Sequence, residues 1–331
     1  TPSLEALRAF EKEGFDITNS TYKHDALASE EDLSLLFDVL TSVKGGNGSS
    51  AKLTANAIMA NPDFDKIRQS AFEEYHYEPF TETFQRYPRH KNNLEIWRQG
   101  IQQKVFFPQY HGREHLNVKR WMNALQSKDK AVRFSFDWQA TFSGKDDYSF
   151  MEAFDWDSPE DTTEHITIIK DGLRIFEQTF GYKPRTFIAP CYNWDPIVEN
   201  TLLESGIRWI QGLPSQLVPT GRFNEYQRIK HNFGDSLTSR SRYNIRNCFF
   251  EPAMSPNRDW ISSCMAQIAS AFLFKRPAVI CTHRVNYVGF INPKNRDRGL
   301  HLLGELLHSI VTKWPDTLFI STDELDSHIN D

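Results

Sequence analysis

The feature that most constrains this chain is the alternation of strand-like and helix-like segments along most of its 331 residues. Short apolar runs, typical of buried strands, alternate with longer segments in which apolar residues recur every three or four positions. This alternation favours a parallel sheet with helical crossovers. Because no internal repeat or linker divides the chain, we expect one α/β domain over residues 1–331, folded as a single barrel.

Local signals give the expected elements. We predict strands at 15–19, 51–59, 105–110, 132–136, 186–190, 207–211, near 228, 244–250, 278–282 and 317–321. We predict helices at 1–13, from 29 to 43, and at 161–180, 196–205, 258–273 and 299–313. Thr1 and Pro2 are typical of a helix start, Ser29 and Asp32 of a capping box, and Gly181 of a helix end. An aromatic-rich, mostly helical insertion occupies about 62–104.

Two histidines four residues apart, His111 and His115, come directly after the apolar run 105–110. Asn117 then offers an N-cap for a helix, so both histidines lie where a strand gives way to a helix. In α/β folds that end of a strand carries ligands and chemistry. Two neutral imidazoles at this spacing can reach one divalent cation if the turn folds their rings together. In a chain with 11 histidines the pattern also arises by chance.

Other predicted strands also end in polar residues. The segment 191–195 follows one strand, and a second strand ends on His283, with Arg284 directly after it. We interpret Asp195 as a helix N-cap, and a role in fixing a loop accounts for Glu251 before a proline. His283 is the strongest candidate of this group because an apolar strand ends on it.

With these residues the chain resembles the polysaccharide deacetylase, or NodB-homology, family. Its members are distorted (β/α)₇ barrels that use a metal ion to remove acetyl groups from N-acetylated sugars or acetylated polysaccharides. His111 and His115 match the family's two metal-binding histidines. His283, at the end of Ile280-Cys-Thr, matches a histidine that lines the acetyl pocket. The resemblance implies a divalent cation, which we expect to be Zn²⁺, and a catalytic role for His283.

The same resemblance assigns substrate-binding residues. The family's Arg-x-Pro-Tyr segment corresponds to 188–192, so it implies that Tyr192 contacts the substrate, although the arginine of that segment is absent. Arg284 and Asn286, directly after His283, are the other candidate substrate-binding residues. His283 also needs an acidic partner to set its tautomer, and the sequence does not identify one.

The start of the chain departs from the family. Members open with a strand ending in two aspartates, one a metal ligand and the other the general base, followed by a helix that often begins Thr-Pro. Thr1-Pro2 resembles the start of that helix, so we expect the aspartate strand to precede the sequence and the site to be incomplete. The alternative is that Asp25 serves as the base.

Composition narrows the partners. The net charge is −5 and no basic run stands out, which argues against nucleic acid as the main partner. We expect no transmembrane segment, because no apolar stretch approaches the length of about 18 residues that a span requires. The four cysteines are widely spaced without a C-x-x-C, which favours a reducing, cytoplasmic compartment, with a removed leader left open. The sequence does not determine the oligomeric state.

Three functions therefore compete. The first is a metal-dependent hydrolase that removes acetyl groups from an acetylated sugar or polysaccharide. The second is a glycoside hydrolase on a related barrel, which needs two carboxylates roughly 5–10 Å apart. Its candidate carboxylates, from which no spacing selects a pair, are Asp137, Asp155, Asp157, Asp195 and Glu251. The third is a non-catalytic barrel that binds a glycan.

Overall fold

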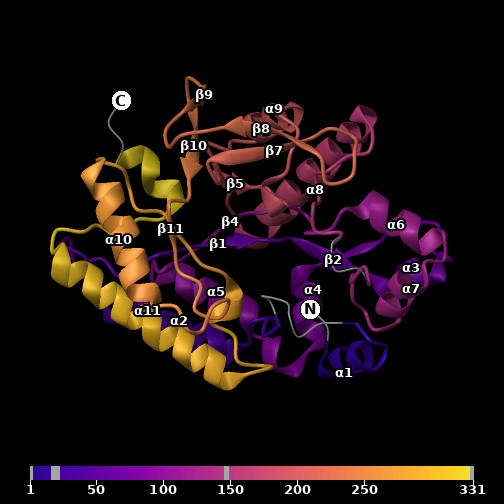
Figure 1. Cartoon of the computed structure of the whole chain (residues 1–331), viewed down its shortest axis with the longest axis horizontal. Helices are drawn as coiled ribbons and strands as arrows, with labels where there is room; N and C mark the ends of the chain where they lie inside the picture. The colour runs from indigo at the N-terminus through magenta and orange to yellow at the C-terminus, as the bar shows by residue number, and fades with distance from the viewer. Residues whose placement is uncertain (1–2, 16–22, 145–148, 329–331) are drawn as a thin grey trace.

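A computed structural model describes residues 3–15, 23–144 and 149–328. Its central element is a six-stranded sheet in the order β1-β4-β5-β6-β10-β9 (Figure 1). The strands are β1 (Leu53–Ala57), β4 (Phe106–Tyr110), β5 (Thr186–Ile188), β6 (Trp209–Gly212), β10 (Ser241–Ile245) and β9 (Ser236–Thr238). The first five are parallel, and β9 pairs antiparallel with β10. The predicted mixed α/β fold with a parallel sheet is confirmed.

Three smaller pairs of strands complete the β-structure of the described residues. The pair β11 (Cys248–Phe249) and β12 (Ile280–Cys281) is parallel, with Phe249 opposite Cys281. The pairs β2 (Ala60–Pro62) with β3 (Tyr77–Pro79) and β7 (Ser215–Pro219) with β8 (Tyr226–Lys230) are antiparallel. Backbone hydrogen bonds therefore define an open sheet and a separate parallel pair, and they do not close a barrel within the described residues.

Helices cover both sides of this sheet. The α-helices are α1 (Leu4–Lys12), α2 (Glu30–Ser42), α3 (Phe64–Gln69), α4 (Phe80–Arg86), α5 (Asn93–Gln102), α6 (Val118–Gln126), α7 (Lys130–Asp137), α8 (Thr162–Phe180), α9 (Ile197–Glu204), α10 (Trp260–Leu273) and α11 (Pro293–Lys313). The 3₁₀ turns are η1 (Pro88–His90), η2 (Pro159–Asp161), η3 (Pro190–Tyr192), η4 (Arg284–Asn286) and η5 (Thr322–Ser327). In Figure 1, α2, α10 and α11 pack together on one side, and α8 and α9 lie on the other. No helix of the described residues has both the length and the apolar character that crossing a membrane requires.

Several boundaries follow the local signals. The side chain of Ser29 accepts a hydrogen bond from the backbone of Asp32 and the reciprocal bond is present, so the predicted capping box starts α2. Asn117 caps α6 through the backbone of Arg120. Gly181, with φ of +76°, ends α8 in the left-handed conformation that glycine adopts without strain.

Two predicted strands are wrong. The segment 132–136 lies within helix α7, because Asp129 caps a helix there and Val132 and Phe136 both become buried one turn apart. Its apolar residues fit the spacing of a strand and of a helix equally well. The segment 317–321 forms no strand, although the carbonyl of Thr317 accepts a hydrogen bond from Gly46. The helix start at Thr1-Pro2 and most of the predicted strand 15–19 lie outside the described residues.

A polar network crosses the interior of the sheet. The amide of Gln211 on β6 donates to Asn56 on β1 at 3.2 Å and to Thr186 on β5 at 2.9 Å. The backbone and hydroxyl of Thr322 both donate to the hydroxyl of Thr54 on β1 at 3.0 Å. Side-chain bonds therefore attach the C-terminal segment to the first strand of the sheet.

Candidate functional site

Five polar side chains follow the carboxyl ends of parallel strands. His111 follows β4, Tyr192 follows β5, Arg246 follows β10, Glu251 follows β11 and His283 follows β12. This is the edge of a parallel sheet at which ligands bind in α/β folds. The contacts described below connect four of these side chains, and the charge of Arg246 also acts on His111, so we treat the five as one candidate site.

The two histidines of the H-x-x-x-H motif face each other. Their ring centroids lie 5.1 Å apart at an angle of 76°. The Nδ1–H of His111 donates to the carbonyl of Ile188 on β5 at 2.8 Å, which leaves the lone pair of that ring on Nε2. The Nδ1 of His115 is buried and has no hydrogen-bond partner among the described residues. A fixed tautomer on one ring and an orphaned nitrogen on the other both fit a metal ligand.

Burial keeps both rings neutral. It is the main cause that lowers the pKa of His111 to about 3, and the charges of His115, Arg246 and His283 add to the effect. Burial likewise lowers the pKa of His115 to about 4. Because a neutral imidazole is the form that binds a metal ion, the pair is ready to act as a ligand at neutral pH.

A buried ionic network holds the residues between the two histidines. The guanidinium of Arg113 contacts Glu114 at 2.6 Å and Asp171 of α8 at 3.0 Å. It also lies over the ring of Tyr77, 4.3 Å from the centroid, and the hydroxyl of Tyr77 donates to the same Asp171. Tyr75 donates to Glu114 at 3.1 Å. The insertion 62–104, which supplies both tyrosines, therefore buttresses the histidine turn.

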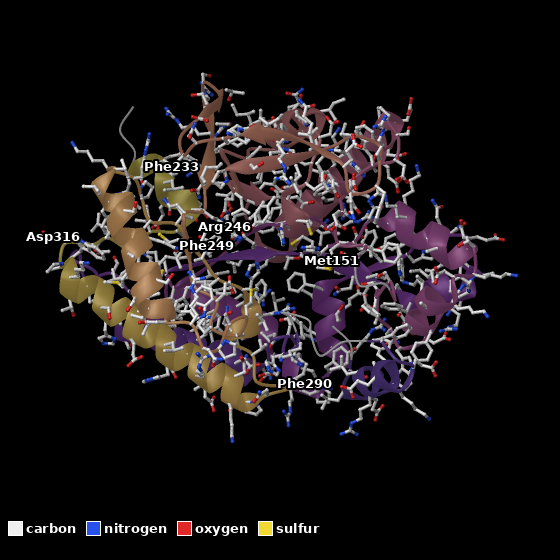
Figure 2. All side chains as sticks on the ribbon, viewed as in Figure 1. Met151, Phe233, Arg246, Phe249, Phe290 and Asp316 are labelled. Carbon is white, nitrogen blue, oxygen red and sulfur yellow. The ribbon has the colours of Figure 1, made fainter. Side chains whose placement is uncertain are left out.

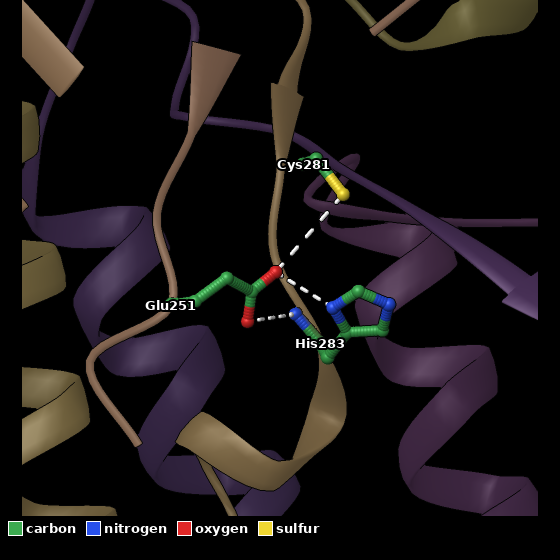
Figure 3. A group of neighbouring side chains, drawn as sticks. All are labelled: Glu251, Cys281 and His283. Atoms are coloured by element: carbon green, nitrogen blue, oxygen red, sulfur yellow. Dashed lines mark hydrogen bonds and ion pairs between the residues drawn. The ribbon is translucent and has the colours of Figure 1, made fainter. Parts of the chain in front are cut away.

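His283 has the acidic partner that the sequence left unidentified. Its Nδ1 lies 2.6 Å from Oε1 of Glu251, and its backbone N–H donates to Oε2 at 3.2 Å (Figure 3). Asn286 donates its amide to Oε2 at 2.8 Å. Glu251 is buried, whereas the His283 side chain is 38% exposed. The carboxylate thus fixes the ring proton on Nδ1, so Nε2 is the nitrogen that can take up and release a proton.

The structure places the remaining predicted residues around this dyad. Asn286 is fully buried, its amide N–H donates to Glu251, and its amide oxygen accepts from the backbone of Ala253. The exposed guanidinium of Arg284 holds Asp25 in a fork, with Nε at 3.0 Å and Nη2 at 2.6 Å from the two carboxylate oxygens. Tyr192 is half-buried at the end of β5.

Tyr192 and its neighbour Cys191 have positive φ values of 58° and 54°. Such left-handed conformations are costly for residues other than glycine and cluster at functional sites. The strained turn brings the hydroxyl of Tyr192 to 3.0 Å from Nη1 of Arg246.

Metal donors can be grouped in a second way. The ligand atoms of Glu251, Cys281 and His283 lie within 4.8 Å of one another, which is close enough to hold a metal ion (Figure 3). Two observations favour a hydrogen-bonded dyad there instead. Burial raises the pKa of the Cys281 thiol, which opposes the thiolate that zinc requires. The cationic Arg246 lies 3.2 Å from the same sulfur and repels a second cation.

Within the described residues, the histidine pair has no third donor close by. In the residues that the structure describes, no additional His, Cys, Asp or Glu joins His111 and His115 in a group of this kind. The pair therefore fits a metal ion in residue type, tautomer and protonation state, and supplies two of the three protein ligands usual in catalytic zinc sites.

Sequence reasoning missed the role of Glu251 and did not consider Arg246. The role of Glu251 follows from the strand register, which only the structure shows. Phe249 lies opposite Cys281 in the parallel pair, so residues two positions later, Glu251 and His283, emerge side by side. No comparable sequence pattern singles out Arg246.

Comparisons with known proteins give structural neighbours at low identity. No family model matches the sequence, and no curated protein matches it. A crystal structure from Mycobacterium smegmatis, provisionally assigned as a polysaccharide deacetylase, is 12% identical with a TM-score of 0.43 and covers 97% of this chain and 83% of its own. A family GH57 branching enzyme from Thermococcus kodakaraensis is 11% identical with a TM-score of 0.37 and covers 92% of this chain and 66% of its own. The description of the first structure names the family that the histidine motif resembles. At these identities and TM-scores, neither similarity is evidence for the activity of this chain.

Proposed function

We propose that this chain is a metal-dependent hydrolase that removes acetyl groups from an acetylated sugar or polysaccharide. The observation that carries the proposal is the joint presence, at strand carboxyl ends, of a neutral imidazole pair and a Glu251–His283 dyad. The first suits a divalent cation, for which we propose Zn²⁺, and the second suits proton transfer. We also propose that residues 1–331 form one domain, a distorted (β/α)₇-type barrel with the insertion at 62–104.

His111 and His115 would hold the cation. When bound, such an ion supplies Lewis acidity to an acetyl carbonyl and to water. The role of the dyad follows from its hydrogen bonds. Glu251 keeps the Nδ1 proton of His283 in place, so Nε2 carries the lone pair of the neutral ring. Once Nε2 has taken up a proton, it can pass that proton to the sugar nitrogen or oxygen that leaves the acetyl carbon.

Asp25 is the proposed proton acceptor. Arg284, the residue after His283, holds its carboxylate through two hydrogen bonds. A carboxylate has about four lone-pair positions, and the arginine fork uses two of them. The remaining positions can take a proton from water. Tyr192 and Arg284 are the proposed substrate contacts.

The two alternative functions, a glycoside hydrolase and a non-catalytic glycan-binding barrel, make different demands on the site. A glycoside hydrolase needs two carboxylates on either side of one bond, and within the described residues Glu251 is the one of its five candidates whose contacts include other side chains of this site. A glycan-binding barrel without catalysis is favoured by one observation, the absence of a third metal donor beside the histidines among the described residues.

The test combines metal content with product analysis. The protein is stripped with a chelator, reloaded with Zn²⁺ and dialysed, and then incubated with acetylated chitooligosaccharides and acetylated xylan. We expect about one zinc ion per chain, release of acetate, and loss of both in His111→Ala and His115→Ala. His301→Ala, which removes an exposed histidine on α11, is the matched control and should keep the zinc. Zinc content that survives in both site variants would refute the metal site, and new reducing ends without acetate would indicate a glycosidase.

A further inference from the structure

Arg246 is the charged residue of this site that the proposed reaction does not yet use. Its backbone N–H donates to Gly212 on the neighbouring strand β6 at 2.9 Å, which fixes its position at the end of β10. Its side chain is half-buried, and Figure 2 shows its label near the middle of that view. Nη1 contacts the Tyr192 hydroxyl at 3.0 Å and the Cys281 sulfur at 3.2 Å.

No carboxylate balances this charge at contact distance. Within the described residues, Arg246 has no acidic side chain within 4.0 Å, the limit of an ion pair. The other arginines around the site differ, because Arg284 holds Asp25 and Arg113 contacts Glu114. A cation withdrawn from water without a paired anion is costly, so proteins retain it mainly where a ligand supplies the anion.

The contacts of Arg246 link it to residues of both halves of the site. Tyr192 belongs to the turn after β5, the strand whose Ile188 carbonyl orients His111. Cys281 lies 4.0 Å from Oε1 of Glu251. An acetyl group located between the histidine pair and the dyad would therefore lie next to this guanidinium.

We propose that Arg246 is the anion-binding residue of the site and that its ligand is a carboxylate-like group, namely the acetate product and the oxyanion that precedes it. The proposal rests on the proposed hydrolase function. A guanidinium presents paired N–H donors that match the two oxygens of a carboxylate. The phenol and thiol beside Arg246 are neutral, so they leave its charge available to such a ligand.

The reaction supplies this anion without a further reactant. Hydrolysis forms a bond from the water oxygen to the acetyl carbon and breaks the bond from that carbon to the sugar nitrogen or oxygen. One proton of the water ends on the sugar atom, and the other is released when acetic acid ionises to acetate. Negative charge thus develops first on the carbonyl oxygen and finally on the carboxylate, and Arg246 stabilises both.

Acetate itself is the probe. Sodium acetate is titrated calorimetrically into the full chain, both stripped of metal and loaded with Zn²⁺, for the wild type, Arg246→Gln and Arg246→Lys. Because a hydrogen-bonded charge pair is lost, we expect Arg246→Gln to weaken acetate binding about 10- to 100-fold. Arg246→Lys keeps the charge without the fork and should fall between. The matched control Arg222→Gln, which removes an exposed arginine, should bind as the wild type.

Two results overturn the proposal: a wild-type chain that does not bind acetate, and folded Arg246 variants that bind it as tightly as the wild type. If Arg246→Gln does not fold, Arg246→Lys decides by the same comparison. Failure of the hydrolase function gives a different result. In that case the zinc-loaded wild type releases no acetate from acetylated sugars, while acetate binding still depends on Arg246.

Discussion

The stability of this protein should depend on pH through the histidines whose pKa burial lowers, and one of them, His165, lies outside the site. His165 of α8 is 6% exposed, and its ring lies 5.7 Å from that of Phe154. Its Nδ1 has no hydrogen-bond partner among the described residues. Burial is the main cause that lowers its pKa from 6.5 to about 4. The folded protein therefore keeps this ring neutral at pH values where the unfolded chain protonates it.

The difference in the pKa of His165 between the folded and unfolded chain sets the sign and size of the change in stability with pH. Between pH 6.5 and pH 4 the unfolded chain binds more protons at this position, so the free energy of unfolding rises with pH. The contribution is nearly complete at pH 7 and is lost progressively as the pH falls toward 4. From pH 7 to pH 5 a pKa difference of this size lowers the free energy of unfolding by about 2 kcal/mol.

Urea unfolding of metal-free protein at pH 8, 7, 6 and 5, at constant ionic strength, measures this term. His165→Phe keeps a ring against Phe154 but cannot titrate, so its loss of stability from pH 7 to pH 5 should be smaller by about 2 kcal/mol. The control His301→Gln removes an exposed imidazole and should behave as the wild type. If the wild type and His165→Phe lose the same free energy, the reasoning from burial is refuted.

Three further substitutions test the site and its supports. Glu251→Gln places an amide against the N–H donors of His283, so we expect acetate release to fall about 10²- to 10⁴-fold. The zinc content measured after dialysis should stay the same. A parallel loss of zinc would instead make Glu251 a metal ligand. Tyr77→Phe removes a hydrogen bond to Asp171 beneath the histidine turn, and zinc affinity, measured against a chelating dye, should fall about 10-fold. If the wild type and Tyr77→Phe bind zinc equally tightly, the insertion at 62–104 does not support the metal site. Gly299→Ala would put a Cβ 1.8 Å from a backbone oxygen of η4, so chemical denaturation should show a loss of about 1–3 kcal/mol, and an unchanged midpoint would contradict this packing.

Much of the fold could be predicted because its signals are local. The capping box at Ser29 and the glycine after α8 lie within a few residues of the boundary that they set. The segment 132–136 failed for the same reason, because its apolar residues fit two periodicities and only the cap at Asp129 decides between them. The histidine pair could be predicted from the sequence because His111 and His115 lie four residues apart in one turn.

The rest of the candidate site depends on contacts between distant parts of the chain. Glu251 and His283 are 32 residues apart, and the parallel register of β11 and β12 brings them together. Tyr192 and Arg246 are separated by 54 residues and meet only across the ends of their strands. Composition and periodicity carry no record of such pairings, so neither the dyad nor the arginine could be assigned from the sequence.

The hydroxyl contacts between Thr54 and Thr322 have a consequence for how the chain reaches its native state. They join positions separated by 268 residues, so they can form only after nearly the whole of the described chain has been synthesised. Contacts of such long range form slowly, because the intervening chain must be ordered before they become favourable. β1 is synthesised early, but its hydrogen bonds with Thr322 can form only late. During synthesis we expect a partly ordered intermediate in which Thr54 still lacks this partner, the kind of species that chaperones protect from aggregation.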